Sequence, residues 1–117
     1  MKKFRLTLIT ENQNRPEKAE KFAELIKLTL NSEIDFEMSK YGKLTDSYKM
    51  EFIGKLNFES ESIAELVELT DRICSPWIIN FDRTENEIEL MFNKTDNSEY
   101  RKNEFNVLNW ANMEIEK

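Results

Sequence analysis

The chain has 117 residues, of which 39% are hydrophobic and 34% charged, and 17 Lys/Arg against 23 Asp/Glu give a formal net charge of −6. This length and apolar content predict one globular domain over residues 1–117 and argue against a disordered chain. No apolar run approaches the roughly 18 residues that a membrane span needs, and the single cysteine precludes an internal disulfide framework. We therefore expect a cytoplasmic protein that does not insert into membranes.

The first strand and the first helix are predicted from two different periods of apolar residues. Phe4, Leu6 and Leu8 alternate with Arg5 and Thr7, as in a half-buried strand. A helix is expected over residues 16–30, because a capping residue, an early proline and a glutamate stand at its start. Its core-facing residues share one helical face: Ala19, Phe22, Leu25, Ile26 and Thr29.

Two strands over residues 34–38 and 48–58 are expected to form a hairpin. Each alternates apolar and polar residues, and the segment Tyr41–Gly42–Lys43 between them is typical of a turn.

A second helix is predicted to begin at Ser62, which forms a capping box with Glu65. At about 100° per residue its apolar positions share an arc about 120° wide, as expected for a core-facing stripe. We expect the following residues to be buried: Ile63, Leu66, Val67, Thr70, Ile73 and Cys74. Pro76 is expected to end this helix.

The remainder of the chain predicts two more strands and an ambiguous tail. Residues 77–82 are apolar on both faces of a strand, which indicates a well-covered strand. Residues 88–92 alternate and predict its hairpin partner. The segment from Phe105 to Ile115 alternates mainly as a strand does. Because Leu108 and Trp110 break the alternation, a short helix is the alternative prediction for this segment.

This order, β-α-β-β-α-β with an extra hairpin strand and a C-terminal segment, predicts an α+β, ferredoxin-like sandwich. Two helices would cover one face of a mostly antiparallel sheet, and the other face would be solvated. The fold alone does not define a function.

The residue inventory argues against catalysis. The chain has no histidine, one cysteine and two glycines, so nucleophilic triads, thiolate zinc sites and phosphate-binding glycine loops are not expected. Two same-strand carboxylate pairs, Asp35 with Glu37 and Glu87 with Glu89, have a spacing that could serve a hydrolase or hold a divalent cation, but we favour the polar side of a half-exposed strand as their explanation. We expect neither an enzyme nor a cofactor.

The acidic charge is concentrated in one part of the chain. Residues 56–100 hold eleven Asp/Glu and three Lys/Arg, a balance of −8. Such a field repels nucleic acid and accelerates the encounter with a cationic protein. An ordinary solvated surface is the alternative explanation. The candidate partner-binding residues are Glu61, Glu65, Glu68, Asp71, Arg72, Asp82, Glu85, Glu87, Glu89 and Trp110.

The acidic helix ESESIAELVELTDR, the strand SPWIINFD and the frame of short alternating strands resemble immunity proteins of bacterial toxin systems, in particular those of contact-dependent growth inhibition. The resemblance implies a monomer or homodimer that binds a cognate toxin, often a basic nuclease domain, and blocks its active site or substrate surface. The competing interpretation is a ferredoxin-like regulatory domain that binds a small molecule.

Overall fold

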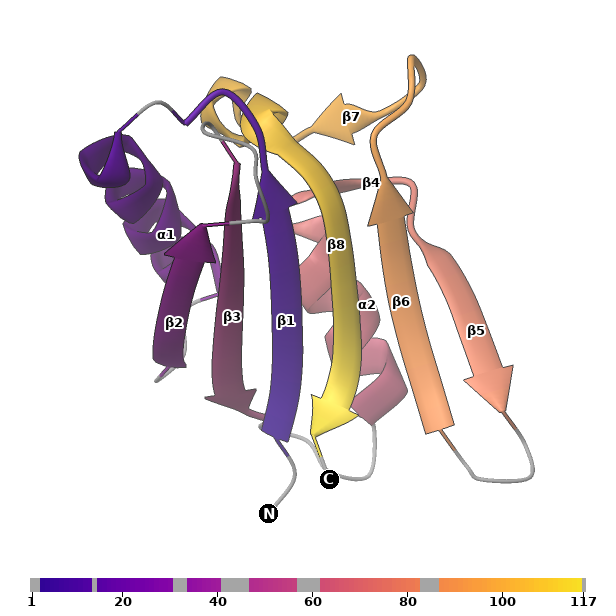
Figure 1. Cartoon of the computed structure of the whole chain (residues 1–117). Helices are drawn as coiled ribbons and strands as arrows, with labels where there is room; N and C mark the ends of the chain where they lie inside the picture. Colours follow the sequence, from indigo (N-terminus) through magenta and orange to yellow (C-terminus); the bar gives the residue numbers. More distant parts are fainter. Residues whose placement is uncertain are drawn as a thin grey trace.

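The computed structural model describes residues 3–13, 15–30, 34–40, 47–56, 62–82 and 87–116. Figure 1 shows a large antiparallel sheet with the helices behind it. The first half of the chain forms β1 (Lys3–Thr10), α1 (Pro16–Leu30), β2 (Ile34–Lys40) and β3 (Tyr48–Lys55). The second half forms α2 (Ser62–Asp71), β4 (Cys74–Ser75), β5 (Ile78–Asp82), β6 (Glu87–Asn93), β7 (Glu99–Tyr100), the 3₁₀ helix η2 (Asn103–Val107) and β8 (Leu108–Glu116).

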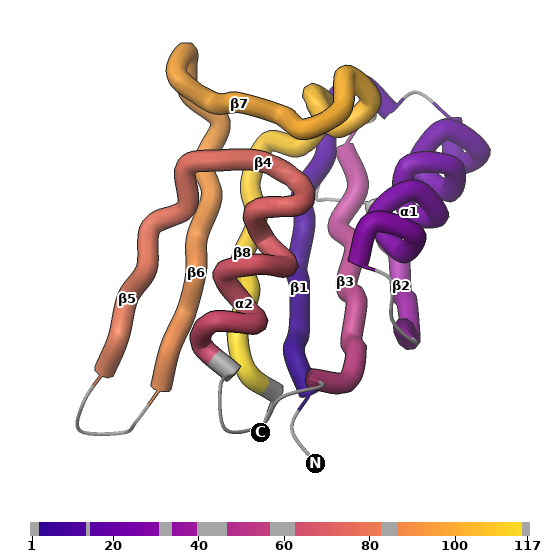
Figure 2. The backbone as a smooth tube through the Cα atoms, turned by 180° about the vertical axis from the view of Figure 1, so that it is seen from behind, coloured from indigo at the N-terminus to yellow at the C-terminus, as the bar shows by residue number. Residues whose placement is uncertain are grey.

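The described residues form a main sheet of six strands in the order β2-β3-β1-β8-β6-β5, and every neighbouring pair is antiparallel. Both helices lie on the same face, with α1 toward the β2 end and α2 nearer the middle (Figures 1 and 2). The prediction of an α+β protein with a mostly antiparallel sheet and two helices on one face is confirmed. No helix within these ranges is long and apolar enough to cross a membrane.

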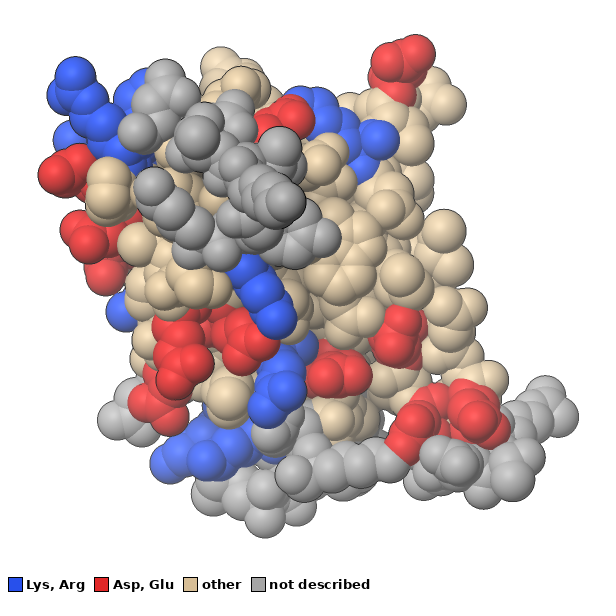
Figure 3. Space-filling model, viewed as in Figure 1, with Lys and Arg blue, Asp and Glu red and all other residues tan. Residues whose placement is uncertain are grey.

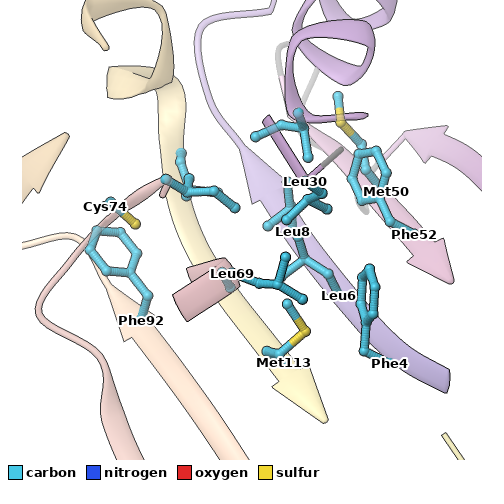
Figure 4. Close-up of a cluster of buried hydrophobic side chains, with 14 of the residues drawn as sticks. Phe4, Leu6, Leu8, Leu30, Met50, Phe52, Leu69, Cys74, Phe92 and Met113 are labelled. Atoms are coloured by element: carbon cyan, nitrogen blue, oxygen red, sulfur yellow. The ribbon is translucent and has the colours of Figure 1, made fainter. Parts of the chain in front are cut away.

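The core lies between the sheet and the helices, and strand alternation creates it. Phe4, Leu6 and Leu8 of β1 are fully buried, whereas Arg5 and Thr7 are half-buried on the open face. Figure 4 shows side chains from β1, β3, β6, β8 and both helices meeting in this layer. Its largest fully buried members include Phe4, Phe52, Phe92, Phe105, Leu6, Leu8, Ile26, Leu30, Met50, Leu66, Ile73 and Leu90.

The strand beside β1 comes from the C-terminal segment and not from the residues that follow α2. β8 pairs with β1 on one side and with β6 on the other. The strand directly after α2, β4, pairs instead with β7 in a separate two-stranded ladder. The β5–β6 hairpin is consequently placed outside β8, at the end of the sheet.

A register shift in β8 explains the broken alternation of the tail. Thr10 pairs with Leu108 and Ile9 pairs with Trp110, so Asn109 is skipped. This bulge turns both Leu108 and Ala111 toward the core, where both are fully buried. The tail is therefore a strand that a short 3₁₀ helix precedes.

Two predictions about burial are wrong. Residues 77–82 were expected to form a well-covered strand, but residues 78–82 are exposed throughout, because β5 is an edge strand that neither helix covers (Figure 2). On α2, the predicted core residues Ile63 and Val67 are 46% and 39% exposed. Leu69, which the predicted stripe does not include, is buried and points into the core beside Met113 (Figure 4). The other four residues of the stripe, Leu66, Thr70, Ile73 and Cys74, are buried as predicted, although Cys74 belongs to β4. The predicted turn at residues 41–43 lies outside the described residues.

Candidate partner-binding surface

The sheet separates the predicted binding residues into two groups. Glu65, Glu68, Asp71 and Arg72 belong to α2 or follow it directly, on the helix side. Asp82, Glu87, Glu89 and Trp110 belong to strands, and strand register places them on the open face. Glu61 and Glu85 lie outside the described residues. The two groups do not form one continuous acidic surface.

Arg72, the residue that follows α2, contacts the C-terminal end of α1. The Arg72 guanidinium donates from Nη1 to the carbonyl oxygens of Thr29 and Leu30, at 3.2 Å each, at the C-terminal end of α1. Its Nε donates to Glu68 Oε1 at 2.6 Å. The last carbonyls of a helix have no intrahelical donor, and a cation there is favourable for the helix dipole. Arg72 and Glu68 therefore contribute to the structure of the protein through these intramolecular contacts.

Asp71 is bound in a similar way. Arg101 donates from Nη2 to Asp71 Oδ1 at 2.7 Å and from Nε to the Asp71 carbonyl oxygen at 2.9 Å. This pair ties the end of α2 to the segment that follows β7. Because Glu68 and Asp71 both have intramolecular cationic partners, the outer side of α2 is a poorer docking surface than its composition indicates.

The carboxylates of the hairpin gather on the open face. Asp82 is the register partner of Glu87, and Asn80 is the partner of Glu89. Glu89 is in turn the partner of Glu114 on β8, which places two carboxylates directly opposite each other. Figure 3 shows carboxylates on both sides of this face, with lysine and arginine between them.

Trp110 lies on the same open face but apart from these acids. It is half-buried, and its register partners are Ile9 of β1 and Asn93 of β6. Asn93, the partner of Trp110, is four residues along β6 from Glu89, so Trp110 lies about 13 Å from Glu89 along the strand direction. Trp77, the other tryptophan, packs on Phe92 with ring centroids 5.7 Å apart and donates from Nε1 to the Cys74 carbonyl oxygen.

The surface that the sequence did not predict is apolar. Ile79 and Phe81 are each 50% exposed, and they face the helix side because their register partners, Leu90 and Ile88, are buried there. Neither α1 nor α2 lies over β5 in Figure 2. An uncovered apolar surface therefore continues from the core to the edge of the sheet.

Two residues of α2 border this uncovered surface. At about 100° per residue, Ile63 and Val67 lie on the opposite flank of α2 from Arg72. Arg72 contacts α1, so Ile63 and Val67 face the β5–β6 end of the sheet. We name Ile63, Val67, Ile79 and Phe81 the edge patch. Ile78, which is 59% exposed, extends apolar surface onto the open face.

The described residues also bear on whether the protein has a metal site, a reactive thiol or a small-molecule pocket. Those residues contain no group of three or more Cys, Asp or Glu side chains that could hold a metal ion. Burial raises the pKa of the Cys74 thiol from its ordinary 9.0 to about 12, which disfavours the nucleophilic thiolate form near neutral pH. A hollow of about 260 Å³ beside Glu37, Lys49 and Glu51 is smaller than common small-molecule sites.

Comparisons with known proteins identify no relative. A scan against protein-family models, a search of curated proteins and a search of solved structures each return no match.

Proposed function

We propose that this protein is an immunity protein that binds a cognate, basic toxin domain in the bacterial cytoplasm and blocks its active site or substrate surface. The observation that supports the proposal best is the exposed apolar strand β5, bordered by carboxylates. Three of its five residues are large and hydrophobic, and each is at least half exposed.

The combination of apolar and acidic groups is what a protein-binding surface requires. Apolar side chains near a patch centre supply the binding free energy, while charges around it increase the association rate and select the partner. Residues 62–93 contain seven Asp/Glu and two Lys/Arg, a balance of −5 out of the −6 of the whole chain. A cationic partner would meet this part of the protein first.

Neutralisation by binding needs no reactive group in the inhibitor. A nuclease domain presents cations to the phosphates of its substrate, and the carboxylates Asp82, Glu87 and Glu89 carry the same sign of charge as those phosphates. The likeness of the sequence to immunity proteins agrees with this use of the acidic hairpin.

The fold supports a related proposal. We infer that the sheet is an enlarged ferredoxin-like sheet in which β2-β3-β1-β8 are the four basic strands. β1 and β2 are connected through α1 and flank β3, as in the split β-α-β unit. The β5–β6 hairpin would then be an addition, and additions to a common fold are where a specific function is often located.

We expect a toxin domain to be encoded immediately upstream of this gene, and the test is co-expression with that domain. We expect restored growth, and an association with the purified toxin domain that weakens by at least about tenfold between about 50 and 500 mM salt. The double variant Glu87→Lys/Glu89→Lys should slow association and weaken protection, whereas Glu17→Lys/Glu20→Lys on α1 should leave both unchanged. Growth arrest despite a folded, expressed protein would contradict the proposal. So would a small metabolite that raises the melting temperature while no protein binds.

A further inference from the structure

We propose that the partner binds by strand addition to the outer edge of β5, through an extended segment that alternates apolar and basic residues. The inference rests on the proposed function in taking the toxin domain as the partner that supplies this segment. The inference goes beyond the proposed function by specifying the binding surface, the backbone conformation of the bound segment and the side chains that this segment needs.

The first argument is the geometry of the edge. β5 ends the six-stranded sheet, so among the described strands only β6 pairs with it, over Ile78–Met91 to Asp82–Glu87. Its other side presents backbone N–H and C=O groups to an incoming strand. Five residues span about 17 Å, which is the usual length of a paired strand.

The second argument is the contrast between the two edges of this sheet. β2, at the opposite end, alternates half-buried apolar residues with exposed Asp35, Glu37 and Ser39. Charged and polar residues on an edge strand are a common protection against unwanted pairing. β5 carries a single charge, Asp82, at its last position. The protein thus protects one edge and leaves the other suited to pairing.

The third argument is that the two faces of β5 select different side chains. On the helix side, Ile79 and Phe81 are the β5 residues of the edge patch, so partner residues that point to this side would be apolar. On the open side, Asp82 is followed across the hairpin by Glu87 and Glu89. Partner residues that point there would be lysine or arginine, because successive side chains of a strand alternate between faces.

Charge decides between a partner protein and a second copy of this chain. Antiparallel pairing of two β5 strands centred on Asn80 would place Asp82 of each copy opposite Ile78 of the other, with no cation on either β5. Each copy also brings a net charge of −6. A cationic strand therefore complements this edge better than β5 itself.

The test uses the full chain and synthetic peptides of about nine residues, long enough to cover β5. The probe alternates valine and lysine. One control peptide has the same composition with the valines grouped together, and the other alternates valine and glutamate. Calorimetry measures the affinity, and amide hydrogen exchange locates the contact. We expect the probe to bind at least about tenfold more tightly than either control and to slow exchange at residues 78–82.

Two variants and a matched control test the surface itself. Ile79→Ser/Phe81→Ser should weaken probe binding by about tenfold or more. Leu28→Ser should change it by less than about twofold, although Leu28 on α1 is 75% exposed and hence more accessible than either residue. Asp82→Asn/Glu89→Gln, which keeps the edge patch intact, should weaken the valine–lysine probe and reduce its salt dependence. Circular dichroism confirms that each variant is folded.

The outcomes separate this inference from the proposed function. Slowed exchange at residues 78–82 both with the probe and in the toxin complex supports it. A toxin complex that protects the cell but leaves exchange at β5 unchanged overturns the inference and retains the function. Probe binding that Ile79→Ser/Phe81→Ser does not weaken overturns it as well. Concentration-dependent dimerisation that Phe81→Ser abolishes would assign the edge to a second copy instead.

Discussion

Replacing Arg72 by methionine should destabilise the protein substantially, even though this residue lies in a segment that reads as a solvated acidic face. Methionine keeps an unbranched side chain of similar length but removes all guanidinium donors. The change leaves the carbonyl oxygens of Thr29 and Leu30 without the donor that Arg72 supplies at 3.2 Å. It also removes a favourable charge from the C-terminal end of α1.

The expected magnitude follows from these contacts. Hydrogen bonds to charged groups contribute about 1.5–3 kcal/mol each, but the Arg72 side chain is 37% exposed, so we reduce this to about 1 kcal/mol for each carbonyl. The total, about 2 kcal/mol, corresponds to a fall of roughly 8 °C in Tm. Glu68→Gln removes only an exposed pair four residues apart on a helix and should cost about 0.3–0.5 kcal/mol.

Urea denaturation of Arg72→Met, Glu68→Gln and the double variant provides the measurement. The coupling free energy from this cycle should be below about 0.5 kcal/mol, because most of the loss comes from the carbonyl contacts. If Arg72→Met is as stable as the wild type to within about 0.5 kcal/mol, the contact between Arg72 and α1 contributes little and our reasoning about α2 is wrong.

Three other predictions concern the core, the thiol and the acidic face. Phe92→Ala should cost about 3–5 kcal/mol in urea denaturation because this ring is fully buried, and a cost below about 1 kcal/mol would contradict the packing described. The pKa of the Cys74 thiol is raised by burial to about 12 from its ordinary 9.0. The unfolded chain therefore loses the thiol proton first, and stability should fall by up to about 1.4 kcal/mol per pH unit as pH rises from 9 toward 12. Cys74→Ala should make this alkaline decline less steep, and an unchanged slope would refute the assignment. Glu89→Gln relieves repulsion with the carboxylate of Glu114 opposite and should raise the free energy of unfolding by a few tenths of a kcal/mol at low salt, whereas a loss of stability would show that the pair is held by other contacts.

Local patterns predicted most of the strands and both helices. In β1 and β3 the period-2 alternation matches burial residue by residue, since one face of each strand covers the core and the other is open. The capping box at Ser62 and the proline at position 16 coincide with the starts of α2 and α1. Each of these signals depends only on residues that are close together in the sequence, so each can be recognised without knowing the fold.

Features that depend on long-range pairing could not be predicted in this way. An apolar run such as residues 78–82 is typical of a covered strand, and only the sheet order reveals that β5 lies at an edge. The same order leaves Ile63 and Val67 beside an uncovered end of the sheet. Asp71 was predicted to belong to an acidic binding surface, but its pairing with Arg101, 30 residues later, has no local signal in the sequence.

The position of β8 has a consequence for folding during synthesis. Among the described strands, β8 alone joins the β2-β3-β1 part of the sheet to the β6-β5 part, and it follows the others in the sequence. Until it emerges from the ribosome, β1 and β6 each have an unpaired edge, and the hairpin has no attachment to the rest of the sheet. Assembly of the described sheet must wait for β8, which predicts a slow, non-local step. The nascent chain therefore exposes more edge than the finished protein, and a prematurely terminated one would be prone to aggregate.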